Sequence, residues 1–313
     1  MPTPKAIGID LGGTKISLVV IDDRGKIYNS STISTRPDND IDTFFDRLSD
    51  KILELSHQLQ DDISGIGIGV PGILDQKHKV VINSVNLKWT NVKFVDALRE
   101  RLNKDVQIKI LGDTLASAIG EYHFGAAQGC NNYIYIAIGT GIGGGIVING
   151  QVLNGASGLA GAVGHYVQDT EGDTCACGLH GCPELLLSGN GLIKRTYHCI
   201  NEGKTRTSLD GSQPLTTTDI ISAAAQNDPL ASAVIEEFGT LLGSVLVNCI
   251  VVTNPEKIVI SGGLGKAIFD IARPYMEKEI SHRLLNAFID PLQVVKSGIE
   301  SSAIGPACMI LFN

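Results

Sequence analysis

One supersecondary unit occurs twice in this chain of 313 residues, and its repetition constrains the fold more than any other feature. In the first copy, apolar strands are expected at 5–9, 16–21 and 26–30, and a turn with two glycines joins the first strand to the second. In the second copy, strands are expected at 132–138, 146–148 and 151–153, and a glycine-rich turn spans 139–145. Two copies of one unit predict a duplicated fold in which two α/β domains face each other.

The first turn reads Asp10-Leu-Gly12-Gly13-Thr14-Lys15. A strand follows it, whereas a helix follows the glycines of a P-loop or of a dinucleotide fingerprint. The amides of the two glycines can still approach a phosphate closely, and Thr14 adds a hydroxyl donor. A plain hairpin turn needs only the two glycines. The flanking Asp10, Thr14 and Lys15 exceed that need, so phosphate binding is favoured.

The second turn contains Gly139-x-Gly141-x-x-Gly144, which fits the dinucleotide-binding pattern. Because a strand and not a helix is expected after it, the match is rejected as a false positive. A third glycine-rich segment, Ser261 to Gly265, ends a strand expected at 257–260.

Two further loops follow expected strands at positions where α/β proteins bind ligands. The strand at 65–70 ends in Pro71-Gly72, and the strand at 106–111 is followed by Gly112 and Asp113. Asp113 is equally consistent with a helix N-cap and with a catalytic carboxylate at a strand end.

Three of the seven cysteines cluster with a histidine in the pattern His165-x9-Cys175-x-Cys177-x4-Cys182. One nitrogen and three sulfurs form the ligand set of a closed structural zinc site. This reading is favoured over a disulfide because the other four cysteines are scattered and the total is odd. Glu184 follows directly and is not needed to complete four ligands.

Composition narrows the functional classes. The net charge is −8 with 19% charged residues, which argues against nucleic acid and anionic membranes as partners. The first ten residues contain no apolar run of signal-peptide length, and the most apolar segment, 241–252, is too short to span a membrane and contains Asn248. With its scattered cysteines, the chain is expected to be a soluble cytoplasmic protein.

Helical periodicity fills the rest of the chain. Apolar residues recur at helical spacing over 41–59, and helices are also expected at 92–102, 113–122, 191–201, 217–226, 230–252, 268–285 and from 302 onward.

Together these segments resemble the ROK family (repressors, open reading frames and kinases) nearly end to end. Asp10 to Lys15 resembles the family's first phosphate motif, Gly139 to Gly145 its second, and Ser261 to Gly265 its adenosine motif. Pro71-Gly72 and Asp113 fall at sugar-site positions. Cys-x-Cys-Gly-x-x-Gly-Cys-x-Glu, from Cys175 to Glu184, is the family's most specific marker.

The resemblance implies a duplicated actin-like ATPase (ribonuclease H-like) fold, with two α/β domains around a cleft. Residues 1–117 and 298–313 would form the smaller domain, with the C-terminal helix packed back on it. Residues 118–297 would form the larger domain, which carries the zinc motif.

The resemblance also implies that ATP phosphorylates a hexose hydroxyl, the 6-OH, as in a glucokinase. Asp113 would be the general base and Asp10 would orient Mg²⁺. The sugar would contact Gly72, Asp113, His165 and Glu184. His165, Cys175, Cys177 and Cys182 would hold structural zinc. ATP would be held by Asp10, Gly12, Gly13, Thr14, Lys15, Gly139, Thr140, Gly141, Gly262, Gly263 and Gly265. A homodimer is implied as well.

Three positions depart from the family pattern. Gly112 and Leu115 stand where asparagines are usual, and Ala162 stands where a glutamate precedes the zinc histidine. Each buried sugar group left unpaired would cost roughly 1–3 kcal/mol. Ala162 opens space near C1 and C2 of a hexose, so an N-acylhexosamine such as N-acetylmannosamine is the alternative substrate.

The second alternative is a non-catalytic, sugar-binding regulator. The family's repressors carry a DNA-binding domain ahead of the first phosphate motif, and Asp10 is expected to leave no room for one. Asp113 and the intact phosphate segments favour an enzyme.

Overall fold

In a computed structural model that describes residues 3–35, 40–59, 63–75, 77, 79–290 and 292–312, the chain forms two compact units. Unit 1 comprises Met1–Gly129, Ile146–Ala160 and Gly298–Asn313. Unit 2 comprises Cys130–Gly145 and Gly161–Ser297. Each unit contains its own hydrophobic core.

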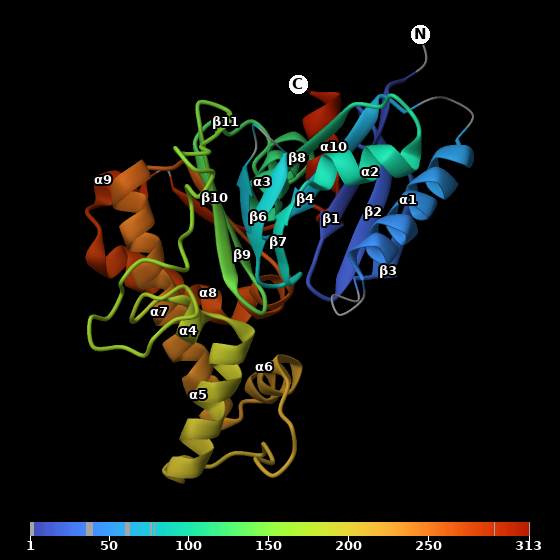
Figure 1. Cartoon of the computed structure of the whole chain (residues 1–313). Coiled ribbons are helices and arrows are strands. Elements are labelled where there is room, and N and C mark those ends of the chain that lie inside the picture. The colour runs from blue at the N-terminus through green and yellow to red at the C-terminus, as the bar shows by residue number, and fades with distance from the viewer. Residues whose placement is uncertain are drawn as a thin grey trace. The chain divides into compact units, whose positions relative to one another are not determined.

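The sheet of unit 1 has the strand order β3-β2-β1-β4-β8 (Figure 1). Antiparallel pairs join β1 to β2 and β2 to β3, whereas β4 is parallel to both β1 and β8. The parallel strands are almost wholly buried, as expected where helices cover both faces of a sheet. The strands span Lys5–Leu11 (β1), Lys15–Asp22 (β2), Ile27–Ser34 (β3), Gly65–Val70 (β4) and Ile108–Gly112 (β8).

Within the described residues of unit 1, the helices are α1 (Ile41–His57), α2 (Phe94–Leu102), α3 (Asp113–Phe124) and α10 (Ile304–Leu311). Asp40 caps α1, because its side chain accepts hydrogen bonds from the amides of Asp42 and Thr43. The C-terminal helix α10 packs on β1 and β4 (Figure 1). This packing is close: a Cβ on Gly67 would lie 1.8 Å from the Pro306 carbonyl oxygen, so only glycine fits there.

The second sheet repeats the arrangement, with the order β11-β10-β9-β12-β13. In both sheets, three strands that are consecutive in sequence are followed by two that return through helices, and β9, β12 and β13 are parallel. The predicted duplication is therefore confirmed. The strands span Tyr133–Ile138 (β9), Ile142–Ile148 (β10), Gln151–Val152 (β11), Lys257–Ser261 (β12) and Gln293–Lys296 (β13).

Unit 2 is the more helical, and α5 and α6 extend away from its strands (Figure 1). Its helices are α4 (Glu184–Leu187), α5 (Gly189–Glu202), α6 (Thr217–Ala225), α7 (Pro229–Thr253), α8 (Gly263–Arg283) and α9 (Asn286–Ile289). By length and composition, α7 would be able to cross a membrane, but half of its apolar window is buried inside the structure. Its packing against α8 and its share of the unit 2 core are those of a core helix.

Three local predictions differ from the structure. Residues 143–145 were expected in a turn, but β10 begins at Ile142, so these glycines lie in a strand. Helix α8 begins at Gly263, five residues before the expected start at 268. A small sheet of β5 (Ile73–Asp75), β6 (Val80–Ser84) and β7 (Trp89–Val92) was not predicted, because its strands are only three to five residues long.

Candidate active site

Asp10 lies near the carboxyl end of β1, where its carboxylate accepts a hydrogen bond from the Ser302 hydroxyl. Burial raises the pKa of Asp10, and the Ser302 hydrogen bond and the charge of Lys15 partly oppose this rise. Ser302 was not predicted as a site residue. It lies in a loop before α10 and is separated from Asp10 by 292 positions, so no local sequence pattern predicts their contact.

Asp113 is the first residue of α3, directly after β8. In the sheet, Asp10 is in register with Gly69 of β4, and Gly69 with Leu111 of β8. A Cβ on Gly69 would lie 3.3 Å from the Asp113 Cα, so the glycine lets the start of α3 pack closely on β4. Burial, and then the charge of Asp10, raise the pKa of Asp113 to about 6. The Thr114 amide donates to Asp113 Oδ1 over 2.7 Å.

The turn after β1 is closed by the Gly12 amide, which donates to the Lys15 carbonyl over 2.9 Å. Thr35, directly after β3, supports it, because its hydroxyl donates to the Gly12 carbonyl over 2.6 Å and its amide to the Thr14 carbonyl over 3.0 Å. Gly13 lies in the same turn, and the side chains of Thr14 and Lys15 are exposed. The turn thus offers exposed donors on a fixed backbone.

Gly72, a predicted sugar-site residue of unit 1, has a φ of +114°. A Cβ there would lie 2.3 Å from the Asn83 carbonyl oxygen of β6. Both the backbone conformation and the close approach therefore require glycine at this position.

In unit 2, the turn between β9 and β10 is held at both of its ends. The Gly139 amide donates to the Gly141 carbonyl over 2.8 Å, and the Gly139 carbonyl accepts the Gly189 amide of α5 over 2.7 Å. At the other end, the Ile142 amide donates to Glu184 Oε2 over 3.0 Å. Thr140 is exposed between these two anchors.

The third glycine-rich segment forms the start of α8. Gly262 has a φ of +80°, and a Cβ on it would lie 2.3 Å from the Ile138 carbonyl oxygen at the end of β9. Gly263 is exposed in the first turn of the helix, whereas Gly265 is buried against Ile138. The exposed amides of a helix start are suited to anionic groups.

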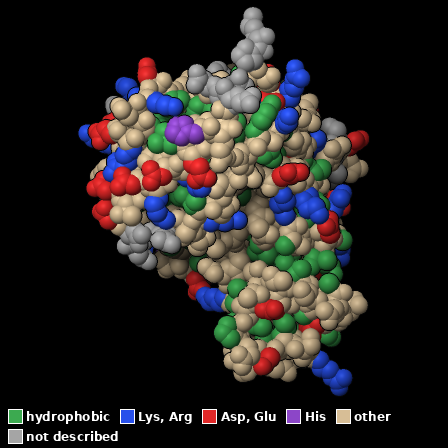
Figure 2. All heavy atoms as spheres, turned by 90° about the vertical axis from the view of Figure 1, so that its right-hand side faces the viewer, with side chains coloured by type: hydrophobic (Ala, Val, Ile, Leu, Met, Phe, Trp, Pro, Cys, Tyr) green, Lys and Arg blue, Asp and Glu red, His purple; other side chains and the backbone are tan. Residues whose placement is uncertain are grey.

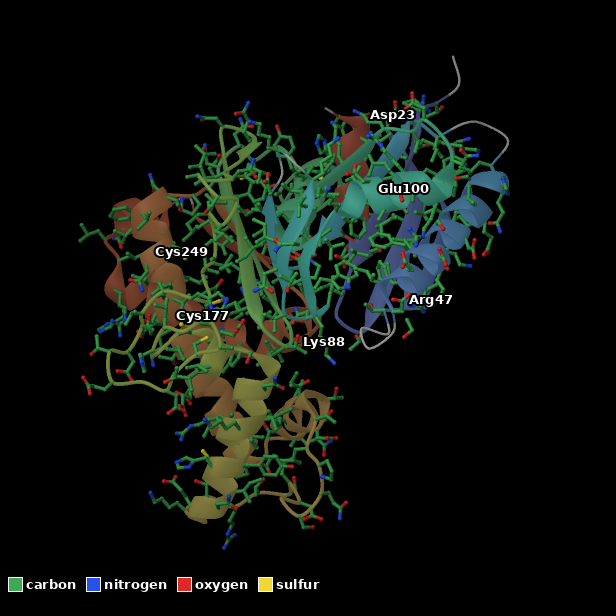
Figure 3. The ribbon with its side chains drawn as sticks, in the orientation of Figure 1. Asp23, Arg47, Lys88, Glu100, Cys177 and Cys249 are labelled. Atoms are coloured by element: carbon green, nitrogen blue, oxygen red, sulfur yellow. The ribbon has the colours of Figure 1, made fainter. Side chains whose placement is uncertain are left out.

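The four predicted zinc ligands come together in unit 2. One ligand atom from each of His165, Cys175, Cys177 and Cys182 lies within 4.8 Å of every other. The remaining cysteines lie elsewhere, and all seven are free thiols. Figure 3 shows Cys177 close to other sulfur atoms in its loop, whereas Cys249 stands apart on α7.

The donor set fits tetrahedral zinc. Two thiolates about 2.3 Å from such an ion lie roughly 3.8 Å apart. Here the Cys177 and Cys182 sulfurs are 3.6 Å apart, and Cys175 Sγ lies 3.8 Å from His165 Nδ1. Cys175 and Cys182 are buried, His165 is half-buried and Cys177 is exposed, so the cluster lies at the protein surface.

The other nitrogen of the histidine faces the glutamate. His165 Nε2 lies 3.9 Å from Glu184 Oε2, which is longer than a hydrogen bond. Since His165 Nδ1 faces the sulfurs, the imidazole can bind a metal with one nitrogen and present the other to a ligand.

The three residues that depart from the family pattern have different environments. Leu115 is 3% exposed and belongs to a small apolar cluster with Leu111, Ala116 and Met309. It also packs close to Gly112, since a Cβ there would lie 3.7 Å from Leu115 Cδ1. Ala162, in contrast, is exposed.

Comparison with known proteins decides the family. The ROK family model matches residues 6–311. The chain belongs to the ROK family. The predicted fold class, a duplicated actin-like ATPase fold, is confirmed for this ROK protein.

Relatives of this ROK protein include enzymes and regulators. It is 34% identical to a glucokinase of Halalkalibacterium halodurans, over 86% of this chain and 83% of that protein. It is 30% identical to a glucokinase of Thermotoga maritima, over 99% and 98%. A xylose repressor of Bacillus subtilis is 29% identical over 98% of this chain and 77% of the repressor.

Among solved structures, a ROK family glucokinase from Streptomyces griseus in complex with glucose and AMPPNP superposes with a TM-score of 0.80. It is 27% identical, over 97% of this ROK protein and 98% of that chain.

Proposed function

We propose that this ROK protein is an ATP-dependent sugar kinase of the glucokinase type, which transfers the γ-phosphoryl group to the 6-OH of a hexose. The observation that carries the proposal is the pair Asp10 and Asp113, which flank the end of β4 in unit 1, where the pKa of Asp113 is raised to about 6. The glucokinase relatives, 30–34% identical, support it.

In the proposed reaction, Asp113 accepts the proton of the sugar hydroxyl as the hydroxyl oxygen bonds to the γ-phosphorus and ADP departs. A general base works best when its pKa lies near the working pH. With a pKa of about 6, Asp113 is ionised at pH 7.5 and is still more basic than an ordinary carboxylate. Gly112, the residue before it, packs against the Leu115 side chain.

The phosphates of ATP would be held by Gly12 to Lys15 and by Gly139 to Gly141, and the nucleotide would approach the backbone at Gly262, Gly263 and Gly265. These segments offer backbone amides and two exposed threonine hydroxyls, the donor types that phosphate oxygens accept. The carboxylate oxygens of Asp10 are the ligand type that Mg²⁺ prefers, and this ion would neutralise charge on the transferred group.

His165 and Glu184 would bind sugar hydroxyls, one as a donor and the other as an acceptor, with Gly72 close to the sugar. Zinc would have a structural role, because four protein ligands leave no open coordination position.

The test is an assay of ADP release over a panel of glucose, mannose, fructose, N-acetylglucosamine and N-acetylmannosamine, with product position read by phosphorus NMR. We expect glucose 6-phosphate. Absence of ADP release with every sugar would contradict the proposal and would favour the sugar-binding regulator; a xylose repressor is among the relatives.

One observation favours N-acetylmannosamine as the second candidate substrate. Ala162 presents only an exposed methyl group three residues before His165, so a bulky 2-substituent meets no large side chain there. A higher kcat/KM for N-acetylmannosamine than for glucose would decide for this alternative.

Nucleic acid is not among the proposed partners. On the face shown in Figure 2, acidic and basic side chains are interspersed, and the whole chain has a net charge of −8. A cytoplasmic location is proposed as well, on the basis of seven free thiols.

A further inference from the structure

Glu184 makes a contact that a sugar-binding residue does not need. Its Oε2 atom accepts the backbone amide of Ile142 over 3.0 Å, although the two residues are 42 positions apart. Ile142 directly follows Gly139, Thr140 and Gly141, the proposed phosphate-binding turn. One carboxylate oxygen therefore fixes the point at which this turn enters β10.

Gly141 lets the carboxylate reach that point. A Cβ on Gly141 would lie 2.5 Å from Glu184 Oε2, which is too close for any side chain unless the carboxylate moves away. The hydrogen bond from Ile142 to Glu184 thus depends on having glycine at position 141.

The same oxygen faces His165, whose Nε2 lies 3.9 Å away. Glu184 also begins α4, and its own amide donates to the Gly164 carbonyl over 3.2 Å, next to His165 in sequence. The carboxylate thus stands between the proposed sugar-binding histidine and the turn that would hold the phosphates, all within unit 2.

We propose that Glu184 is a positioning residue for the Gly139–Ile142 turn and that it couples the binding of sugar to the binding of nucleotide. A sugar hydroxyl bound to Glu184 fixes the carboxylate, and the fixed carboxylate holds the turn in its phosphate-binding form. Because such coupling is reciprocal, nucleotide also tightens the binding of sugar. The coupling, but not the positioning, rests on the proposed kinase function.

Amide hydrogen exchange followed by NMR, without any substrate, tests the positioning. Loss of a hydrogen bond to a charged acceptor should speed exchange at Ile142 by about tenfold or more in Glu184→Ala. Glu184→Gln keeps an acceptor oxygen and should restore protection. Glu171→Ala removes an exposed glutamate of the loop between His165 and Glu184 and serves as the matched control. The Cys175 amide, which donates to the Leu179 carbonyl over 2.7 Å, reports whether that loop stays folded.

Gly141→Ala provides an independent variant, because its methyl group would displace the Glu184 carboxylate. It should speed exchange at Ile142 as Glu184→Ala does, and the double variant should exchange no faster than either single variant. Wild-type protection of Ile142 in Glu184→Ala, or additive effects in the double variant, would overturn the positioning role.

Calorimetric titration with AMPPNP, with and without saturating glucose, tests the coupling. We expect glucose to tighten AMPPNP binding by about 5- to 100-fold in the wild type and in Glu171→Ala, and by less than about twofold in Glu184→Ala. AMPPNP affinity without sugar should also be weaker in Glu184→Ala, which loss of a sugar contact alone would not produce.

Equal coupling in wild type and Glu184→Ala, or none in the wild type, would overturn the coupling. Failure of the proposed function is a separate result: it would appear as no sugar phosphorylation by the wild type. The exchange experiment uses neither substrate, so it decides the positioning role in either case.

Discussion

Asp113 and Asp10 flank the end of β4 in unit 1, and the charge of Asp10 adds to burial in raising the pKa of Asp113 to about 6. Two carboxylates whose charges interact resist ionisation of both, because each negative charge destabilises the other. In the proposed reaction, Asp113 would serve as the basic carboxylate and Asp10 as a ligand for Mg²⁺.

The rate of phosphoryl transfer should follow the ionisation of Asp113. The base must be ionised, so kcat/KM should be level above pH 7 and should fall by about tenfold per pH unit below pH 6. The measurement is the pH profile of kcat/KM for glucose between pH 5 and 8.5. A profile that stays level down to pH 5 would refute a base with this pKa.

Asp113→Asn should stabilise the folded protein at neutral pH. The folded pKa of Asp113 is raised above 3.8, so its ionisation is disfavoured by folding. The resulting loss of stability is absent below pH 3.8, grows through the window up to pH 6, and is complete above it. Removing the charge should therefore increase the free energy of unfolding by about 1–3 kcal/mol at pH 7.5 and hardly at all near pH 4.

Urea unfolding at the two pH values measures this difference. Asp96→Asn, in which the replaced side chain is exposed on α2, is the control and should change stability little at either pH. Destabilisation by Asp113→Asn at pH 7.5 would contradict the prediction. It would show that favourable contacts of the ionised carboxylate outweigh the cost of its burial and the repulsion from Asp10.

The cysteine cluster should contain about one zinc ion per chain by elemental analysis. Removal of the ion by a chelator should lower Tm and weaken glucose binding, because His165 and the segment leading to Glu184 lose their anchor. Cys177→Ser should have the same effects, whereas Cys249→Ser, on α7, should retain the metal. A stoichiometric disulfide between Cys177 and Cys182 would contradict the zinc site.

Ala162→Glu should shift specificity toward glucose. An acidic side chain at this exposed position would add an acceptor for a sugar hydroxyl and would occupy the space needed by an N-acyl group. The ratio of kcat/KM for glucose to that for N-acetylmannosamine should rise by about tenfold, the value of one hydrogen bond. An unchanged ratio would exclude position 162 from the control of specificity.

Periodicity and spacing were sufficient to predict the repeated strands, most helices and the grouping of His165 with the three cysteines. Those features are local, or repeat at a fixed spacing, so the sequence displays them directly. Helix α8 began earlier than expected because a Ser-Gly-Gly-Leu-Gly segment has low helix propensity, and the buried packing of Leu264 and Gly265 overrides it.

The contacts that join distant residues had no such signal. Ser302 reaches Asp10 only because α10 packs on β1. This packing depends on glycines that α10 approaches closely, and the sequence does not show which segment lies against them. Glu184 was expected to bind sugar, but its contact with Ile142 depends on the path of the main chain. Every residue except proline has a backbone amide, so the type of residue 142 does not show that its amide binds Glu184.

The most direct test of the central claim compares phosphoryl transfer in wild type and Asp113→Asn at pH 7.5, with glucose binding measured on the same samples by calorimetry. Asparagine keeps the size of the side chain but cannot accept the proton, so transfer should slow by roughly 10²–10⁴-fold. Glucose affinity should stay within about threefold, because an amide still hydrogen-bonds a hydroxyl. Near-normal transfer by a variant that binds glucose normally would contradict Asp113 as the base.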